Sequence, residues 1–264
     1  MQQKVCYVTA FYDLNRSTWS RFARTTSVYI KSFLPLIPLV EEDANAECIV
    51  FLDDRHRVPE LDETHSFRII PINKEVLSTL HCWSTLDRER AIMESREFQE
   101  LIPDRLHFPE HSIPEYTLIN HSKVDFIREA MKYTDAPYFA WIDFGYFQLP
   151  QRIPQRLLDT TLLNNERINY TTIQPYQPLY SNILYTLRYA PECIGGFFFF
   201  GSREKMIEYR QLYHQVLAMF QEQYAIADDD QHIALVCYTK QPELFTLHNL
   251  GGWHRALTHF QIKS

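Results

Sequence analysis

A single carboxylate, Asp143, stands where chemistry is expected, at the end of the apolar run Trp141-Ile142-Asp143-Phe144-Gly145-Tyr146. In open α/β sheets, ligands gather at the carboxyl ends of strands, and a carboxylate there can hold a divalent cation that binds diphosphate oxygens. An Asp that only caps the next turn is the alternative. A protein-kinase interpretation of Asp143-Phe144-Gly145 is not favoured, because neither a glycine-rich phosphate loop nor a His-Arg-Asp segment precedes it.

A second acidic group is the run Asp228-Asp229-Asp230, which is followed by Gln231 and His232 at the start of an apolar helical stretch. Adjacent carboxylates there can cap the helix and interact favourably with its positive end. In the functional interpretation, Asp230 acts as a general base or as a hydrogen-bonding partner of sugar hydroxyls.

Near the end of the chain, His248 follows an expected apolar strand and precedes the pair Gly251-Gly252. A histidine in that position can complete a metal site with Asp143, or fold over a diphosphate together with a basic residue such as Arg255. A lone histidine has a structural role more often than a ligand role, so His248 is a candidate only in combination with Asp143.

The chain has six glycines, and they fall in three short segments, two of which are described above. In the third, Gly195, Gly196 and Gly201 bracket four phenylalanines. Glycine allows a ligand to approach the backbone closely, so Gly195 and Gly196 are candidates for contact with a sugar or its acceptor; ordinary turns and a buried strand are the alternatives. We expect Phe197–Phe200 themselves to pack in the core.

The elements that must position these residues alternate between strands and helices. Compact apolar runs predict strands, and apolar residues spaced three and four apart predict helices. This alternation predicts a mostly parallel, three-layer α/β sheet in one domain. The expected strands are 4–11, 48–52, 67–71, 138–142, 168–173 and 195–200, and the expected helices are 25–34, 86–102, 123–132, 204–223 and 231–238.

Composition limits the class of protein. A formal net charge of −7 argues against a nucleic-acid partner, because phosphate binding needs a concentrated basic surface. We find neither an apolar stretch of the ~20 residues that cross a bilayer nor a secretory signal at the start, so we expect a cytoplasmic protein. The five widely spaced cysteines, without a Cys-x-x-Cys pair, are expected to be reduced buried thiols rather than metal ligands or disulfides.

Taken together, these segments resemble the HtrL/YibB family of bacterial and viral proteins related to GT-A glycosyltransferases. The resemblance covers nearly the whole chain. The cytoplasm expected for this protein is that of a bacterium, or that of the host cell if the protein is viral. The segments that carry it are Val8-Thr9-Ala10-Phe11-Tyr12, Asn120-His121-Ser122-Lys123-Val124-Asp125-Phe126, Trp141-Ile142-Asp143-Phe144-Gly145-Tyr146, Gly195-Gly196-Phe197-Phe198 and Asp230-Gln231.

The resemblance implies a GT-A-like, Rossmann-type fold in which residues 1–145 bind a nucleotide sugar and residues 146–264 bind the acceptor. It implies a uridine diphosphate sugar as donor, a glycan or lipid-linked saccharide as acceptor, and Mn²⁺ or Mg²⁺ as cofactor. Asp143 would stand at the Asp-x-Asp position, with Lys123 near the donor. The base and ribose would be bound by Thr9, Ala10 and Phe11, with Asp53 or Asp54 at the end of the second strand.

The sequence departs from the GT-A pattern at Gly145, which occupies the position of the second carboxylate. Asp143, His248, diphosphate oxygens and water would then have to hold the metal ion. Transfer without a metal ion is the other possibility, with Lys123 or Arg255 neutralising the departing diphosphate. We therefore expect a metal-assisted glycosyltransferase, with an inactive GT-A-like protein that binds a glycan or a partner, and a nucleotidyltransferase or phosphohydrolase, as alternatives.

Overall fold

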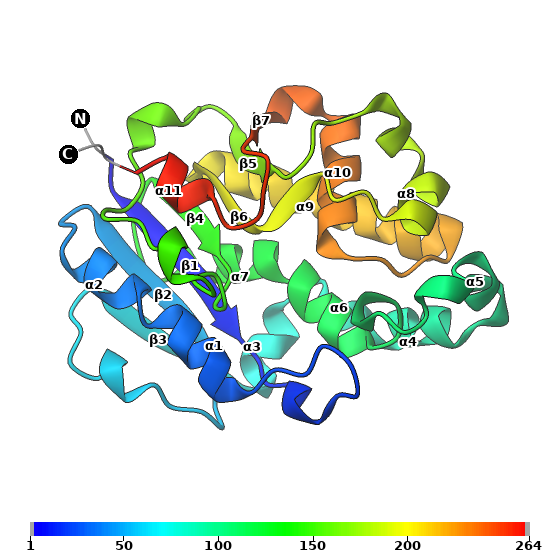
Figure 1. Ribbon diagram of the computed structural model, residues 1–264, viewed down its shortest axis with the longest axis horizontal. Coiled ribbons are helices and arrows are strands. Elements are labelled where there is room, and N and C mark those ends of the chain that lie inside the picture. The colour runs from blue at the N-terminus through cyan, green and yellow to red at the C-terminus, as the bar shows by residue number, and fades with distance from the viewer. Residues whose placement is uncertain (1–2, 262–264) are drawn as a thin grey trace.

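The computed structural model describes residues 3–261 and contains one seven-stranded sheet in the order β3-β2-β1-β4-β6-β5-β7 (Figure 1). All six expected strands are present. A seventh, β7, lies at one edge and includes His248, which was expected to follow a strand. The strands are β1 Val5–Phe11, β2 Ala46–Asp53, β3 Phe67–Ile72, β4 Tyr138–Ile142, β5 Ile168–Thr172, β6 Ile194–Ser202 and β7 Phe245–Asn249.

The sheet is mixed, although most of its strands are parallel. Strands β3, β2, β1 and β4 pair in parallel, and so do β5 and β7. Strand β6 is antiparallel to both of its neighbours, β4 and β5. The phenylalanines predicted that β6 is a strand. They did not predict its direction, because an apolar run that is buried on both faces gives no information about strand direction.

The order of the strands creates a switch point beside β1. From β1 the chain proceeds outward through β2 and β3, and then returns to place β4 on the other side of β1. At such a switch point, ligands bind in the crevice at the carboxyl ends of the adjacent strands, here β1 and β4.

Two apolar cores cover the two faces of the sheet and make three layers, as expected. Alternation along β1 sends Cys6 and Val8 to one face and Val5 and Tyr7 to the other. The helices α1 Thr26–Phe33, α2 Leu36–Glu41 and α11 Ala256–His259 pack on the second face. The first face is covered by α3 Lys74–Thr79, α4 Leu86–Glu94, α5 Arg96–Leu101, α6 Pro114–His121, α7 Lys123–Ala130, α8 Ile183–Tyr189, α9 Arg203–Ala218 and α10 Asp230–Lys240.

Two of the expected helices differ in detail. The stretch 86–102 is not one helix, because Ser95 is extended and caps α5 by accepting a hydrogen bond from the Phe98 amide. Helix α9 continues into a π-helical turn, Met219–Tyr224. Helices α2, α3, α6, α8 and α11 were not predicted.

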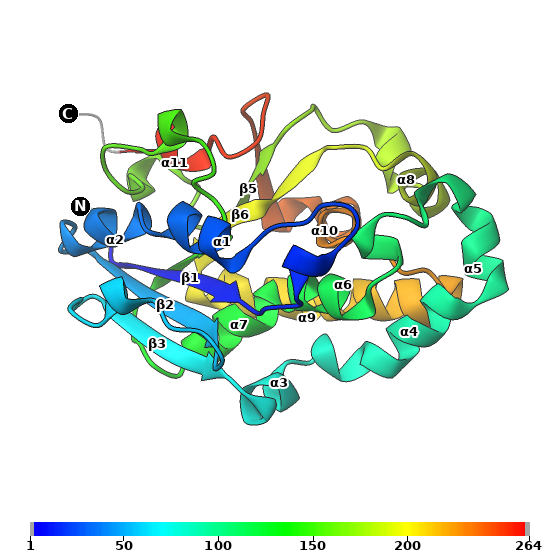
Figure 2. The same cartoon turned by 60° about the horizontal axis from the view of Figure 1, so that its bottom comes forward.

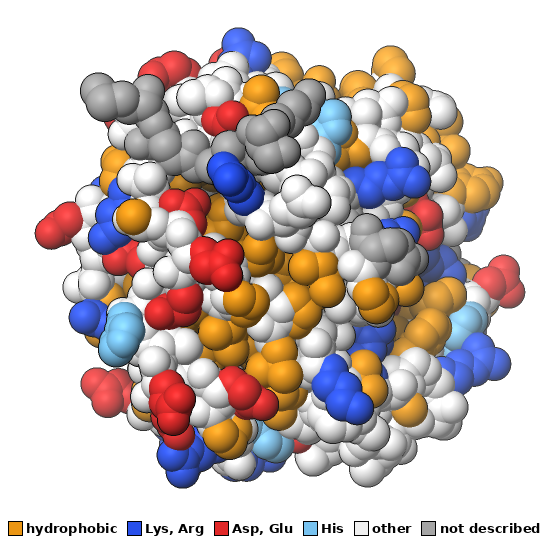
Figure 3. Space-filling model, turned by 60° about the vertical axis from the view of Figure 1, so that its left-hand side comes forward, with side chains coloured by type: hydrophobic (Ala, Val, Ile, Leu, Met, Phe, Trp, Pro, Cys, Tyr) orange, Lys and Arg blue, Asp and Glu red, His pale blue; other side chains and the backbone are white. Residues whose placement is uncertain are grey.

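Burial agrees with two further expectations. Phe197–Phe200 are almost fully buried, and all five cysteines are buried and free of disulfides. None of the helices in the described part of the chain has both the length and the apolar character needed to cross a membrane. Figure 3 shows one face of the molecule, on which acidic and basic side chains are interspersed with exposed hydrophobic side chains.

Candidate functional site

A cavity of about 280 Å³ lies at the switch point, at the carboxyl ends of β1 and β4. One wall comes from the end of β1 and the segment after it, which reaches toward α6 in Figure 2. The opposite wall comes from the segment 141–145 at the end of β4. The lining residues are Ala10, Phe11, Tyr12, Asp13, Leu14, Arg16, Trp19, Arg24, Thr26, Tyr29, Tyr116, Ile119, Asn120, Lys123, Trp141, Asp143, Phe144, Gly145, Gln148 and His254.

Lys123, the first residue of α7, is the centre of the polar site. Its side chain is only 7% exposed, and its ammonium group lies 2.8 Å from Asp230 Oδ2 and 3.1 Å from Asp143 Oδ1. It also donates a hydrogen bond of 2.9 Å to the Gly196 carbonyl oxygen. An ammonium group has three donors, so each of the three has an acceptor. The structure therefore brings together Lys123, Asp143, Asp230 and Gly196, as residues from four separate segments.

Burial and charge act in opposite directions on this group. Burial lowers the pKa of Lys123, but Asp143 and Asp230 more than offset that effect and hold the pKa above its usual value. Burial is the main reason that the pKa of Asp230 is raised to about 6, although Lys123 acts to lower it. Lys123 is therefore a fixed positive charge at the wall of the cavity.

Asp143 is the acidic member that faces the cavity, with 35% of its side chain exposed. Its Oδ1 accepts a 2.7 Å hydrogen bond from the Trp141 indole in addition to the contact with Lys123. Its backbone amide donates to the Phe197 carbonyl oxygen at 3.0 Å, which ties the end of β4 to β6. The carboxylate is thus held in one orientation by donors on a single oxygen.

The three adjacent aspartates at the start of α10 make three different contacts. Asp229 caps the helix, because its side chain accepts a hydrogen bond from the His232 amide at 2.8 Å. Asp228 is buried and lies 2.9 Å from His232 Nδ1. Asp230 points to Lys123 and does not appear among the described residues that line the cavity. Asp229 therefore has the expected capping role, and Asp230 belongs to the polar site around Lys123.

Gly196 is required by the packing of α10 against β6. A Cβ atom at this position would lie 2.5 Å from Asp230 Oδ2 and 2.9 Å from Gln231 Cγ. The absent side chain of Gly196 thus makes room for Asp230. A Cβ at Gly195 would instead contact the Phe197 ring at 2.4 Å. Among the described residues, neither glycine lines the cavity, so their close approach is to protein side chains.

Two arginines of the segment after β1 add positive charge to the opposite wall. Arg16 donates to the Phe22 carbonyl oxygen at 2.8 Å and to the Tyr29 hydroxyl at 2.7 Å. Arg24 lies over the Tyr29 ring, 5.1 Å from its centroid, and a Cβ at Gly145 would be 3.6 Å from its Nη1. Arg24 therefore lies beside the turn that carries Asp143.

His254 also lines the cavity, where it packs against Tyr146 and Phe197. Burial is the main reason that its pKa is lowered to about 4, so the ring is neutral at pH 7. Its Nδ1 atom is buried without a hydrogen-bond partner.

Other expected site residues lie elsewhere. His248 is on the edge strand β7, and its Nε2 is 2.9 Å from Asn169 Oδ1. The exposed Arg255 donates to the Leu250 carbonyl oxygen. Within the described chain, neither residue lines the cavity, so the structure does not bring His248 to Asp143.

Two strand ends were expected to bind the nucleotide, and only the end of β1 faces the cavity, whereas Asp53 at the end of β2 does not. Ala10 and Phe11 line the cavity, whereas Thr9 is fully buried. Asp53 is buried too, and it accepts hydrogen bonds from the Asp13 amide at 3.0 Å and from Arg55. Asp53 therefore positions the segment after β1 rather than facing the cavity.

Sequence reasoning missed Arg16, Arg24, Trp19, Tyr116 and His254. The arginines lie in a segment whose polar character after the first strand was visible, but nothing in their spacing indicated that they turn back toward Asp143. His254 was visible only as a neighbour of His248. Its left-handed backbone, with φ of 54°, turns its ring into the cavity and could not be predicted from residue types.

The cavity does not provide the ligands of a GT-A metal site. Two carboxylates of the described chain line it, Asp13 and Asp143, and both already have protein partners. Asp13 contacts His56 and accepts a hydrogen bond from the Asn15 amide, and Asp143 contacts Lys123 and Trp141. Gly145 stands where the second carboxylate of an Asp-x-Asp pair would be expected. In the described residues, the groups of three potential metal ligands are Cys82, Asp125 and His214, and Asp228, Asp229 and His232, and neither set lines the cavity.

A mixed α/β sheet with a polar site at its switch point defines the class of this protein, and its family is defined by sequence. The chain belongs to the family described as bacterial protein of unknown function (HtrL_YibB), which matches residues 3–262. Protein HtrL of Escherichia coli (strain K12) is 28% identical over 276 residues, which cover 95% of this chain and 90% of that protein. The family resemblance predicted from the sequence motifs is confirmed.

Proposed function

We propose that this protein is a glycosyltransferase that moves a sugar from a nucleotide diphosphate donor, such as a uridine diphosphate sugar, to a hydroxyl group of a glycan or lipid-linked acceptor. The observation that carries the proposal is the position of Lys123. It is a buried cation held between two carboxylates, at the wall of a cavity that lies at the switch point of an α/β sheet. Switch points are where such sheets bind nucleotides.

The composition of the cavity supports this donor class. Aromatic rings of Tyr12, Trp19 and Tyr116 line it and provide flat apolar surfaces for a base or a sugar. Arg16 and Arg24 provide planar donors that match phosphate oxygens. A volume of about 280 Å³, open at one side, accommodates part of a nucleotide sugar and leaves the acceptor to approach from solvent.

The proposed chemistry follows from where charge develops. As the glycosidic bond to the diphosphate breaks, negative charge grows on the departing phosphate oxygens, and fixed cations stabilise that state more than the ground state. Lys123 and Arg24, which flank Asp143, are assigned to this task. Asp143 accepts the proton of the attacking hydroxyl or orients that hydroxyl. Asp230, first expected to be the base, is assigned to positioning Lys123.

No step of this reaction involves a metal ion, because the described residues that line the cavity do not provide a metal-ligand set. The glycosyltransferase resemblance implies Mn²⁺, whereas in this chain the ammonium group of Lys123 supplies a fixed positive charge beside Asp143. We therefore expect donor cleavage to persist when divalent cations are removed with a chelator.

A panel of nucleotide sugars tests the proposal. The protein is incubated with each donor, with and without added Mn²⁺ and with chelator, and release of the nucleotide diphosphate is measured. Asp143→Asn is expected to lower the rate by about 100-fold, in the range found for removal of one transition-state contact. Asp135→Asn is the matched control, because Asp135 is exposed and lies before β4.

Three outcomes contradict parts of the proposal. Binding of a donor without any cleavage would favour an inactive GT-A-like binding protein. Attack that releases nucleotide monophosphate would favour a phosphohydrolase. An unchanged rate in Asp143→Asn would exclude this cavity as the reaction centre.

A further inference from the structure

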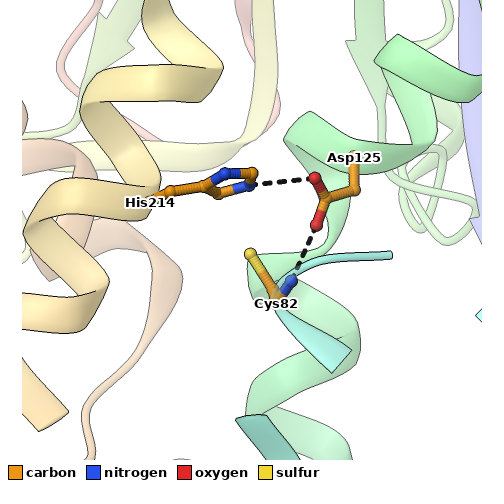
Figure 4. Close-up of side chains that lie close together, drawn as sticks. All are labelled: Cys82, Asp125 and His214. Atoms are coloured by element: carbon orange, nitrogen blue, oxygen red, sulfur yellow. Dashed lines mark hydrogen bonds and ion pairs between the residues drawn. The ribbon is translucent and has the colours of Figure 1, made fainter. Parts of the chain in front are cut away.

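A second cluster of reactive side chains lies outside the cavity, between α7, α9 and the segment after α3. Cys82, Asp125 and His214 each offer one potential ligand atom, and these atoms lie within 4.8 Å of one another. Figure 4 shows the three side chains pointing toward a common centre from three separate segments of the chain. Cys82 is fully buried and the Asp125 side chain is 1% exposed, whereas that of His214 is 15% exposed.

His81 stands at the outer side of this group. Its ring packs against the ring of His214, with centroids 4.1 Å apart, and His81 is exposed. The His81 ring therefore lies on the side of the cluster that solvent and ions can reach.

The carboxylate is oriented from two directions. Asp125 Oδ2 accepts a 2.9 Å hydrogen bond from the Cys82 amide, and Asp125 Oδ1 accepts a 2.7 Å hydrogen bond from Arg210. Each carboxylate oxygen has two lone pairs, and those of Oδ1 face Arg210 and His214 Nε2, so a metal ion would take the place of the proton shared by His214 and Asp125. Fixed second contacts of this kind orient the ligands of metal sites in proteins.

We propose that Cys82, Asp125 and His214 bind a zinc ion, with water in the fourth position. One sulfur, one oxygen and one nitrogen atom, completed by water, match the ligands that tetrahedral zinc accepts. The His214 Nε2 and Asp125 Oδ1 atoms are 2.9 Å apart, so ligation requires them to separate by a few tenths of an ångström. Zinc binding converts the Cys82 thiol to a thiolate, and the released proton passes to solvent.

The site joins three segments that are far apart in sequence. It links the turn before α4 to α7 and α9, and Lys123 lies two residues before Asp125 on the same helix. Cys82 would then be an exception to the expectation that the cysteines are not metal ligands. The sequence carries no Cys-x-x-Cys pair because the ligands come from separate elements. The proposal does not depend on the proposed glycosyltransferase activity.

Cobalt substitution tests the proposal directly. Metal-free protein is titrated with Co²⁺ and then with Zn²⁺, and absorption in the near ultraviolet reports a bond between thiolate and cobalt. We expect one metal ion per chain, with the charge-transfer band lost in Cys82→Ser. Zinc affinity is expected to fall by about 100-fold or more in His214→Gln, because even contacts outside the ligand shell cost about 10–100-fold.

The controls are Cys193→Ser, a buried cysteine elsewhere, and His107→Gln, an exposed histidine. Both are expected to bind metal as the natural protein does. The proposal is overturned if the folded natural protein binds neither metal at micromolar concentration. It is equally overturned if the charge-transfer band survives in folded Cys82→Ser, or if folded His214→Gln binds zinc as tightly as the natural protein.

Discussion

The polar site is stable only while Lys123 and its two carboxylate partners are all present. Burying a charge is costly, and removing one member of a buried ion pair leaves the others without compensation. We therefore expect Lys123→Met to lower the free energy of unfolding by about 3 kcal/mol or more, because Asp143 and Asp230 then face each other without a cation. Urea denaturation measures this change, and Lys74→Met, at an exposed position, is the control.

A double variant separates stability from chemistry. In Lys123→Met/Asp230→Asn the uncompensated charge is removed, so at least about 1 kcal/mol of the lost stability is expected to return. Donor cleavage is not expected to return, because the fixed cation is still missing. If the double variant cleaved the donor at the natural rate, Lys123 would have a structural role only.

The pair of Asp228 and His232 predicts a pH dependence of stability. Burial acts to lower the pKa of His232, but Asp228 and Asp229 raise it to about 9, above the ordinary value of 6.5. The folded protein therefore holds this proton more tightly than the unfolded chain does. The resulting stabilisation, at most about 3 kcal/mol, is fully present below pH 6.5 and is lost as the pH rises through 9.

Denaturation curves at pH 6 and pH 9.5 test this prediction. The natural protein is expected to lose stability over this range by more than His232→Gln loses. An equal loss in both proteins would mean that His232 does not titrate as described. Other groups contribute to both curves, so the difference between the two proteins is the quantity to compare.

At the residue scale, the apolar strand pattern singled out Asp143 and the family resemblance singled out Lys123, and the two side chains are in contact in the structure. The sequence could not predict their contact. The lysine and the two carboxylates are 20 or more residues apart in sequence, and only the packing of α7 and α10 against β6 brings them together. His248 was predicted to be the metal ligand because it lies near the end of a strand. In the structure its side chain forms a hydrogen bond with Asn169 instead.

At the scale of elements, the contact between β6 and α10 depends on the missing side chain of Gly196. We expect Gly196→Ala to destabilise the protein by about 1–3 kcal/mol, because its Cβ would lie 2.5 Å from Asp230 Oδ2. Displacing Asp230 would also disturb Lys123, so donor cleavage should fall. Thermal and chemical denaturation, together with the cleavage assay, measure both effects.

Gly252→Ala is the control for this substitution. A Cβ there would meet the Arg255 side chain at 3.0 Å, and a flexible exposed side chain can move away. We expect a change below about 0.5 kcal/mol, as for surface substitutions in general. If Gly196→Ala were equally mild, α10 would not depend on close approach to β6.

Local patterns predicted which elements exist better than they predicted their limits. The apolar spacing of 86–102 continues across Ser95, but a serine that accepts a hydrogen bond from an amide three residues later starts a new helix. Strand β6 was visible as an apolar run with glycines at its ends, whereas its antiparallel direction follows from the path of the whole chain. Short helices such as α2, Leu36–Glu41, contain prolines and offered no periodic signal.

At the scale of the whole molecule, strand order determines where the site lies. Because β1 has β2 on one side and β4 on the other, the segments that follow β1 and β4 form the two walls of the cavity. The segment after β1 crosses to α6, where Trp19 packs against Tyr116 edge to face. It then returns to α1 through Phe22, which stacks on Phe108.

This segment has few backbone hydrogen bonds to the rest of the fold and is held chiefly by side chains. Two of its residues, Asn15 and Phe22, have positive φ angles, which are uncommon for residues other than glycine. Such segments exchange amide hydrogen more readily than the strands beside them. A ligand that contacts Arg16 and Arg24 would bind only when the segment lies over the cavity, and would therefore hold it there.

We expect binding of a nucleotide sugar to slow amide hydrogen exchange across residues 14–25, with little change in β2 or β3. Hydrogen exchange followed by mass spectrometry, with and without the donor that the panel identifies, measures this effect. Arg24→Met is expected to weaken donor binding by about tenfold or more, through loss of a charge-assisted contact with phosphate. Arg21→Met, an exposed arginine three positions earlier, is the matched control and should bind normally. If both variants lost affinity equally, only the general charge of the segment would matter, and the contact assigned to Arg24 would be wrong.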